Sequence, residues 1–140
     1  MTFFSSLLKE LGDELGINLS PDSKGNCIVT FNGTINVHIK PSRNDKILVA
    51  SIVGDVPPGA FRTRILQAAL MSNALPAPSY GVFGYSEDTN NLILFGYIPS
   101  AGLTGKILYD YLRRFILKLN TWSRTLKSGE IPAIVTNSKR

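Results

Sequence analysis

The chain has 140 residues, of which 15 are Lys or Arg, 10 are Asp or Glu, and 44% are hydrophobic. This is the composition and length of one ordinary globular domain, which we expect over residues 1–132, followed by a flexible tail over 133–140. One cysteine and one histidine exclude a disulfide framework and metal centres built from several Cys or His residues, so we expect neither a metal nor a cofactor.

The N-terminal segment predicts an amphipathic helix over residues 3–16, ending at Gly16 as a C-cap. Its apolar stripe consists of Phe4, Leu8, Leu11 and Leu15. Phe3 and Leu7 add apolar surface beyond what that stripe needs, so these side chains either face a groove or a partner, or complete the core. Four charged residues interrupt the apolar run, so it is not a secretory signal, and no stretch approaches the ~18–20 apolar residues of a membrane span. We therefore expect a soluble protein of the cytoplasm, without membrane insertion.

Three strand signals follow, over residues 27–31, 35–40 and 47–53. Asn32-Gly33 favours a tight hairpin between the first two. The second alternates apolar and polar residues, whereas the third is nearly continuously apolar, so we expect both of its faces to be covered. The three strands predict an antiparallel meander.

The second half of the chain predicts a helix over residues 60–73, a hairpin of strands 80–86 and 91–98, and a long helix over 103–127. Gly129 and Pro132 end that helix, whose apolar face is formed by Leu108, Leu112, Phe115, Leu119, Trp122 and Leu126. The order α-β-β-β-α-β-β-α predicts an α+β fold, in which three helices pack on an antiparallel sheet.

The basic surplus lies near the C-terminal end, because residues 103–128 carry six basic residues and one acidic residue. Such a segment is either a solvated helix face or a surface for nucleic acid, an anionic membrane or an acidic protein. A basic nucleic-acid-binding module is thus an alternative function, although no strand or helix motif for nucleic acid recognition is present. It would use Arg113, Arg114, Lys118, Arg124 and Lys127.

Catalytic chemistry finds little support in the sequence. Cys27 and His38 are the only thiol and imidazole, and no third group is placed to orient them. The neighbouring carboxylates at 13–14 and 87–88 are typical of a helix surface and a turn. Residues 102–106 (GLTGK) lack the spacing of a phosphate-binding loop, so we interpret them as a helix start. An enzyme is therefore the least supported class.

The order of elements resembles the class I type III secretion chaperones, the Tir-chaperone (CesT-like) family, over roughly residues 3–128. Several local segments are similar to that family: LLKELG at 7–12 with Leu15-Gly16, CIVTFNG at 27–33, LMSNA at 70–74, GVFGY at 81–85 with NLIL at 91–94, and residues 115–122.

The resemblance implies a homodimeric, non-enzymatic chaperone of the bacterial cytoplasm. Such a protein binds an extended N-terminal segment of a secreted virulence effector, keeps it secretion-competent and helps deliver it to the export apparatus. An export ATPase or sorting platform is a further partner that the resemblance allows. A cargo strand could also add to an open sheet edge. Because these chaperones are usually acidic and this chain is basic, we expect a cargo with an acidic segment.

The resemblance also implies two sets of site residues. The cargo-binding set is Phe3, Phe4, Leu7, Leu11, Val29, Phe31, Val37 and Ile39. The dimer set is Phe61, Ile65, Ala69, Leu70, Val82 and Phe83.

Overall fold

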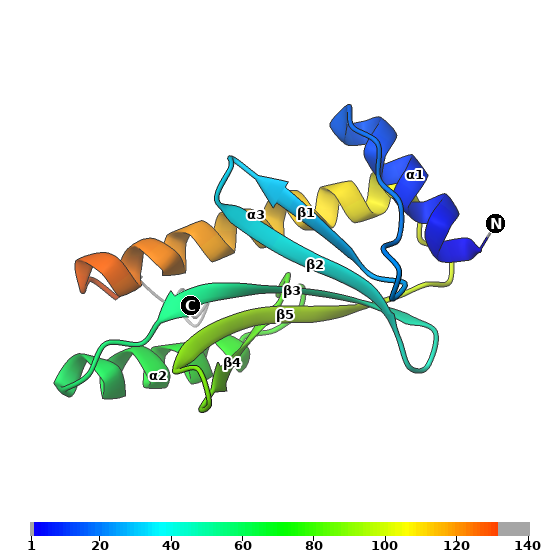
Figure 1. Ribbon diagram of the computed structural model, residues 1–140. Helices are drawn as coiled ribbons and strands as arrows, with labels where there is room; N and C mark the ends of the chain where they lie inside the picture. Colours follow the sequence, from blue (N-terminus) through cyan, green and yellow to red (C-terminus); the bar gives the residue numbers. More distant parts are fainter. Residues whose placement is uncertain (1, 132–140) are drawn as a thin grey trace.

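The structure is a computed structural model that describes residues 2–131 (Figure 1). It contains three helices and five strands in the predicted order. They are α1 (Phe3–Leu15), β1 (Cys27–Phe31), β2 (Ile35–Ser42), β3 (Lys46–Asp55), α2 (Ala60–Asn73), β4 (Val82–Ser86), β5 (Asn91–Pro99) and α3 (Gly105–Ser128). The α+β fold expected from the sequence is confirmed, and the expected tail over 133–140 lies outside the described residues.

The five strands form one antiparallel sheet in the order β1-β2-β3-β5-β4. The meander of β1, β2 and β3 is confirmed, and Asn32 and Gly33 both have the positive φ that their hairpin requires. The segment 41–46, expected as a loop, instead extends β2 and β3 to a tight turn at Asn44 and Asp45, which also have positive φ. The strand expected from residue 80 begins only at Val82.

One face of the sheet carries the core. The long helix α3 runs behind the sheet in Figure 1. Helix α1 crosses the N-terminal half of α3, and α2 lies beside β4, near the C-terminal half of α3. The predicted apolar face of α3 is buried throughout. Near its C-terminal half, the Trp122 ring lies 4.4 Å from that of Phe83 on β4.

Helix α1 is fixed by its ends and by a close approach to α3. The Thr2 hydroxyl accepts a hydrogen bond from the Ser5 N–H at 3.1 Å, and Gly16 is the left-handed C-cap that the sequence predicts. Phe4, Leu8 and Leu11 are buried as expected. Of the two alternatives for Leu7, the structure shows the second: Leu7 is only 2% exposed and completes the core. Packing against both α3 and the sheet buries a wider stripe than one helix face.

Candidate functional site

The two residues that could have formed a nucleophile–base pair lie on opposite faces of the sheet. The β1–β2 register pairs Cys27 with Ile39 and Ile28 with His38. Cys27 is buried toward the core, whereas His38 is exposed on the other face. Burial raises the pKa of the Cys27 thiol, and the charge of Asp22 raises it further. The site therefore disfavours the reactive thiolate.

Side chains of the protein itself accept hydrogen bonds from backbone N–H groups at the glycine-rich start of α3. Thr104 is the N-cap, and its hydroxyl accepts a hydrogen bond from the Ile107 N–H at 3.2 Å. The Glu10 carboxylate of α1 accepts one from the Gly105 N–H at 2.8 Å. An acidic side chain thus takes the position that an anion would need at this helix end. Among residues 2–131, no three His, Cys, Asp or Glu side chains gather into a potential metal site.

The predicted cargo residues divide sharply by exposure. Phe3 is 49% exposed and Phe31 is half-buried. The other six are buried within the single subunit; they are Phe4, Leu7, Leu11, Val29, Val37 and Ile39. Of the predicted set, Phe3 and Phe31 are the most exposed, and the buried Phe4 also lines a surface hollow.

Phe3 overlooks an apolar hollow of about 510 Å³ at one end of the molecule. The hollow lies between the start of α1, the turn that joins β2 to β3, and the segment after β5. It is lined by Thr2, Phe3, Phe4, Ser5, Pro21, Gly25, Pro41, Ser42, Asp45, Lys46, Ile47 and Ser100. An exposed aromatic ring at the mouth of such a hollow is typical of a contact site for apolar side chains.

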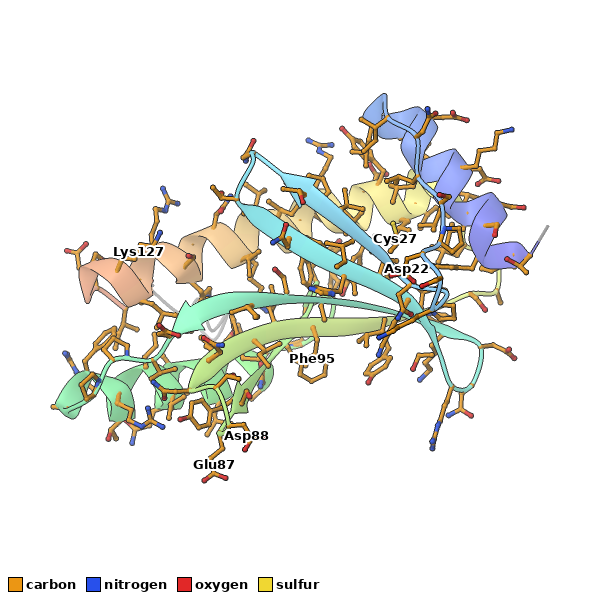
Figure 2. The ribbon with its side chains drawn as sticks, viewed as in Figure 1. Asp22, Cys27, Glu87, Asp88, Phe95 and Lys127 are labelled. Carbon is orange, nitrogen blue, oxygen red and sulfur yellow. The ribbon has the colours of Figure 1, made fainter. Side chains whose placement is uncertain are left out.

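The larger candidate surface is the sheet face that points away from α3, which we call the outer face. Its exposed or half-buried apolar side chains are Ile28, Leu48, Ala50, Ile52, Val82, Ile93, Phe95 and Tyr97. Ile28, Ile52 and Tyr97 are each more than half exposed. Phe95, labelled on β5 in Figure 2, lies edge-on to Tyr97 with ring centroids 6.2 Å apart. No helix covers this face within residues 2–131.

The outer face does not follow from the sequence, because the apolar run of β3 predicts a strand that is covered on both sides. That expectation is wrong, since residues of β3 alternate between buried and more exposed positions. The signal that could have found the face is the register. The Asn32-Gly33 turn sets Ile28 against His38, and His38 in turn lies opposite Ala50.

The edge strand β4 and helix α2 form a second surface. Of the predicted dimer residues, Ile65, Ala69 and Phe83 are buried, Phe61 and Val82 are half-buried, and Leu70 is 69% exposed. A shallow hollow of about 210 Å³ beside Leu70 is lined by Leu66, Ala69, Leu70, Asn73, Phe83, Gly84, Tyr85 and Leu92. The exposed apolar side chains of this surface therefore come from α2, through Leu70 and through Met71, which is 54% exposed.

Asn73 closes the free edge of β4 at one point. Its side-chain oxygen accepts a hydrogen bond from the Phe83 N–H at 2.7 Å, and its amide group donates one to the Phe83 carbonyl at 2.9 Å. The side chain thus replaces a neighbouring strand at Phe83, which protects the edge from pairing with another chain. By contrast, β1 pairs only with β2 among the described residues.

The basic residues of α3 do not form one continuous surface. Lys118 turns inward, where its ammonium donates hydrogen bonds to the carbonyls of Ser79 at 3.1 Å and Gly81 at 2.7 Å. Burial lowers the pKa of this ammonium below its ordinary value. Arg114 lies over the ring of Tyr80, 5.2 Å from its centroid. Lys118, one of the five predicted phosphate contacts, therefore serves to fix the loop before β4.

Comparison with known proteins identifies the family that has this architecture. The model of the Tir chaperone protein (CesT) family matches residues 6–123. The search of curated protein sequences found no match. No helix among residues 2–131 combines the length and apolar character needed to cross a membrane.

Solved structures share the fold at low sequence identity. A chain in the complex of the Yersinia pestis type III secretion chaperone SycH with a stable fragment of YscM2 is 23% identical, with a TM-score of 0.67, and the match covers 85% of this chain and 98% of that one. A chain of the ExoT–SpcS complex from Pseudomonas aeruginosa is 12% identical, with a TM-score of 0.66 and coverage of 85% and 96%. With the family model matched over most of its length, the chain belongs to the Tir chaperone protein (CesT) family.

Proposed function

We propose that this chain is a bacterial type III secretion chaperone. As a cytoplasmic homodimer it binds an extended N-terminal segment of an effector, keeps that segment secretion-competent and presents it to the export apparatus, where an export ATPase or sorting platform is the receiving partner. Membership of the family supports the class of function. The similar SycH and ExoT–SpcS structures are themselves complexes of two proteins.

The observation that carries the proposal is the uncovered outer face. A folded subunit that leaves Ile28, Ile52 and Tyr97 more than half exposed on one sheet face has apolar surface in excess of its own core. An extended cargo segment can cover such a face with alternate side chains. It can also pair its backbone with the open edge of β1. Ordering a disordered segment costs a few kcal/mol, which a wide wrapped surface offsets.

The dimer contact is proposed at the surface of α2 and β4. Because Asn73 closes the β4 edge at Phe83, two copies would meet there through side chains of α2, with Leu70 at the centre and Met71 beside it. This arrangement leaves the outer face of β1, β2 and β3 free for cargo in both subunits.

The test is to isolate the native partner with the tagged chain from the bacterial cytoplasm and to measure the mass of the complex by light scattering. We expect two copies of this chain with one secreted protein, and limited proteolysis that spares only an N-terminal segment of that protein. A monomer that captures no secreted protein would contradict the proposal, and so would a partner bound only through a folded domain.

A further inference from the structure

The sheet is forked at one end. Strand β2 pairs with β3 only where His38–Ser42 lie opposite Lys46–Ala50. Beyond that point β2 continues alongside β1, and β3 continues alongside β5 as far as Asp55. In Figure 1 the β1–β2 hairpin rises away from β3, and α3 passes behind the hairpin. In the part of the chain that the structure describes, no strand fills the gap between β2 and β3.

Two local features define where the fork begins. The register of β3 with β5 shifts between Ile52 and Gly54, and such a bulge bends and twists its strand. At the apex of the fork, the Ser51 hydroxyl donates a hydrogen bond to the Asn36 carbonyl at 2.7 Å. A side chain, rather than a backbone ladder, therefore makes the last link between β2 and β3.

The fork encloses a groove of about 430 Å³. Its walls are β2, β3 and the C-terminal half of α3, and its polar lining includes Asn36, His38, Asn120, Ser123, Arg124 and Lys127. No Asp or Glu lines the groove. Neither Arg124 nor Lys127 donates a hydrogen bond to a carboxylate within residues 2–131, and Lys127 lies near the free end of α3 in Figure 2. Among residues 2–131, the groove thus combines two strand edges with two cations that no carboxylate hydrogen-bonds.

The occupant that suits this groove has a peptide backbone and negative side chains. Strand edges present N–H and C=O groups in alternation, and an extended peptide satisfies both, whereas a nucleic acid backbone lacks this regular alternation of donors and acceptors. Beyond the hydrogen bond between Ser51 and Asn36, β3 continues over residues 52–55. At about 3.3 Å per residue, this stretch would hold roughly four residues of such a peptide. The two cations on α3 would then select Asp and Glu over Lys and Arg.

We propose that the fork between β2 and β3 binds a short acidic segment of the partner protein as an inserted strand. This inference rests on the proposed chaperone function and deepens it, because it assigns the acidic part of the cargo to one groove and its apolar part to the outer face. It also assigns two residues of the basic surplus, Arg124 and Lys127, to the recognition of acidic side chains.

The test uses a short fluorescent peptide that alternates Glu with Val, and the same peptide with Lys in place of Glu. Anisotropy should show that the unaltered protein binds the Glu peptide and not the Lys peptide, more weakly as salt rises. The double variant Arg124→Glu/Lys127→Glu should lose about tenfold or more in affinity. The control Lys106→Glu/Arg113→Glu makes the same change in net charge on exposed positions of α3 outside the groove and should stay within about twofold.

A second pair of variants tests the groove itself without changing charge. Ser123→Trp fills it from α3, whereas Thr121→Trp places the same ring on an exposed position of that helix outside the lining. We expect only Ser123→Trp to abolish peptide binding. The assignment is overturned by an unaltered protein that does not bind the Glu peptide, by equal losses in both charge variants, or by a single-stranded oligonucleotide that displaces the peptide.

The same variants separate this inference from the proposed function. If the Arg124→Glu/Lys127→Glu protein retains its co-purified secreted partner with unchanged affinity, the fork assignment fails and the chaperone function stands. If the unaltered chain captures no secreted partner, the chaperone function fails, and the peptide measurement still decides whether the fork is an acidic-peptide site.

Discussion

Glu10 of α1 and Gly105 of α3 are locked together, with the Glu10 carboxylate accepting a hydrogen bond from the Gly105 N–H at 2.8 Å. The two backbones approach so closely that a Cβ at Gly105 would lie 2.4 Å from the Glu10 Cβ and 2.6 Å from the Leu11 nitrogen. This contact sets the position of α1 on α3, and with it the position of Phe3 beside the apolar hollow.

Replacing Gly105 by alanine should therefore destabilise the fold. The added methyl group meets backbone atoms of α1, which cannot move aside without shifting the whole helix. We expect a loss of about 1–3 kcal/mol in the free energy of unfolding, measured by chemical denaturation. Lys106→Ala, an exposed neighbour in the same helix, should change stability by less than about 0.5 kcal/mol. Equal effects of the two substitutions would refute the close packing of the helices.

The Gly105 contact also marks the limit of what the sequence predicts. Residues 102–106 correctly indicate a helix start, since Thr104 and the following apolar periodicity are local signals. The acceptor, the Glu10 carboxylate of α1, lies far away along the chain, and no local sequence pattern predicts it. The same limit leaves Leu7 undecided from the sequence, because the width of the buried stripe of a helix depends on how many elements pack around it.

The outer face illustrates a different limit. The order of the strands, the Asn32-Gly33 turn and the helix caps at Gly16 and Gly129 follow from short-range chemistry and are confirmed. Whether a sheet face is covered depends on where the helices dock, which the apolar run of β3 does not specify. The site residues carried over from the family therefore mixed core positions such as Val37 with accessible ones such as Phe3.

Asn73 should stabilise the fold through its two hydrogen bonds to the edge of β4. Asn73→Ala removes both partners of the Phe83 backbone and leaves an N–H and a C=O without hydrogen bonds, so we expect stability to fall by about 1–3 kcal/mol. Denaturation with urea measures the loss, and Gln67→Ala, an exposed residue of the same helix, is the matched control. An Asn73→Ala protein as stable as the control would show that these two bonds contribute nothing.

Tyr111 should titrate far above an ordinary tyrosine. Burial raises its pKa to about 12, and the neighbouring Tyr80 contributes to the shift. Because the folded-state pKa exceeds the unfolded value of about 10, this group stabilises the fold fully below pH 10. That contribution is lost as pH rises toward 12.

Phenolate absorbance of the native protein should thus contain a component near pH 12 that disappears in Tyr111→Phe. Tyr97→Phe, a substitution at a tyrosine that is 52% exposed, should leave that component in place. A spectrum without a late component, or one that persists in Tyr111→Phe, would mean that the Tyr111 hydroxyl is open to solvent.

The proposed dimer surface predicts that one charge on α2 separates the subunits. Leu70→Glu places a carboxylate at the centre of the apolar contact, where its desolvation opposes association. Light scattering should report the mass of a monomer for this variant and of a dimer for the unaltered chain. Leu117→Glu makes the same change on α3 at a matched exposure, 68% against 69%, and should remain dimeric. A Leu70→Glu protein that stays dimeric would place the contact elsewhere.

The most direct test of the outer face as the cargo surface is the affinity of the co-purified partner's N-terminal segment for two matched variants. Ile28→Glu places a charge on the outer face, whereas Ile107→Glu makes the same substitution on α3 at similar exposure, 51% against 53%. We predict that calorimetry shows a loss of about tenfold or more for Ile28→Glu and almost none for Ile107→Glu. Equal affinities for the two variants, with both folded, would contradict the account.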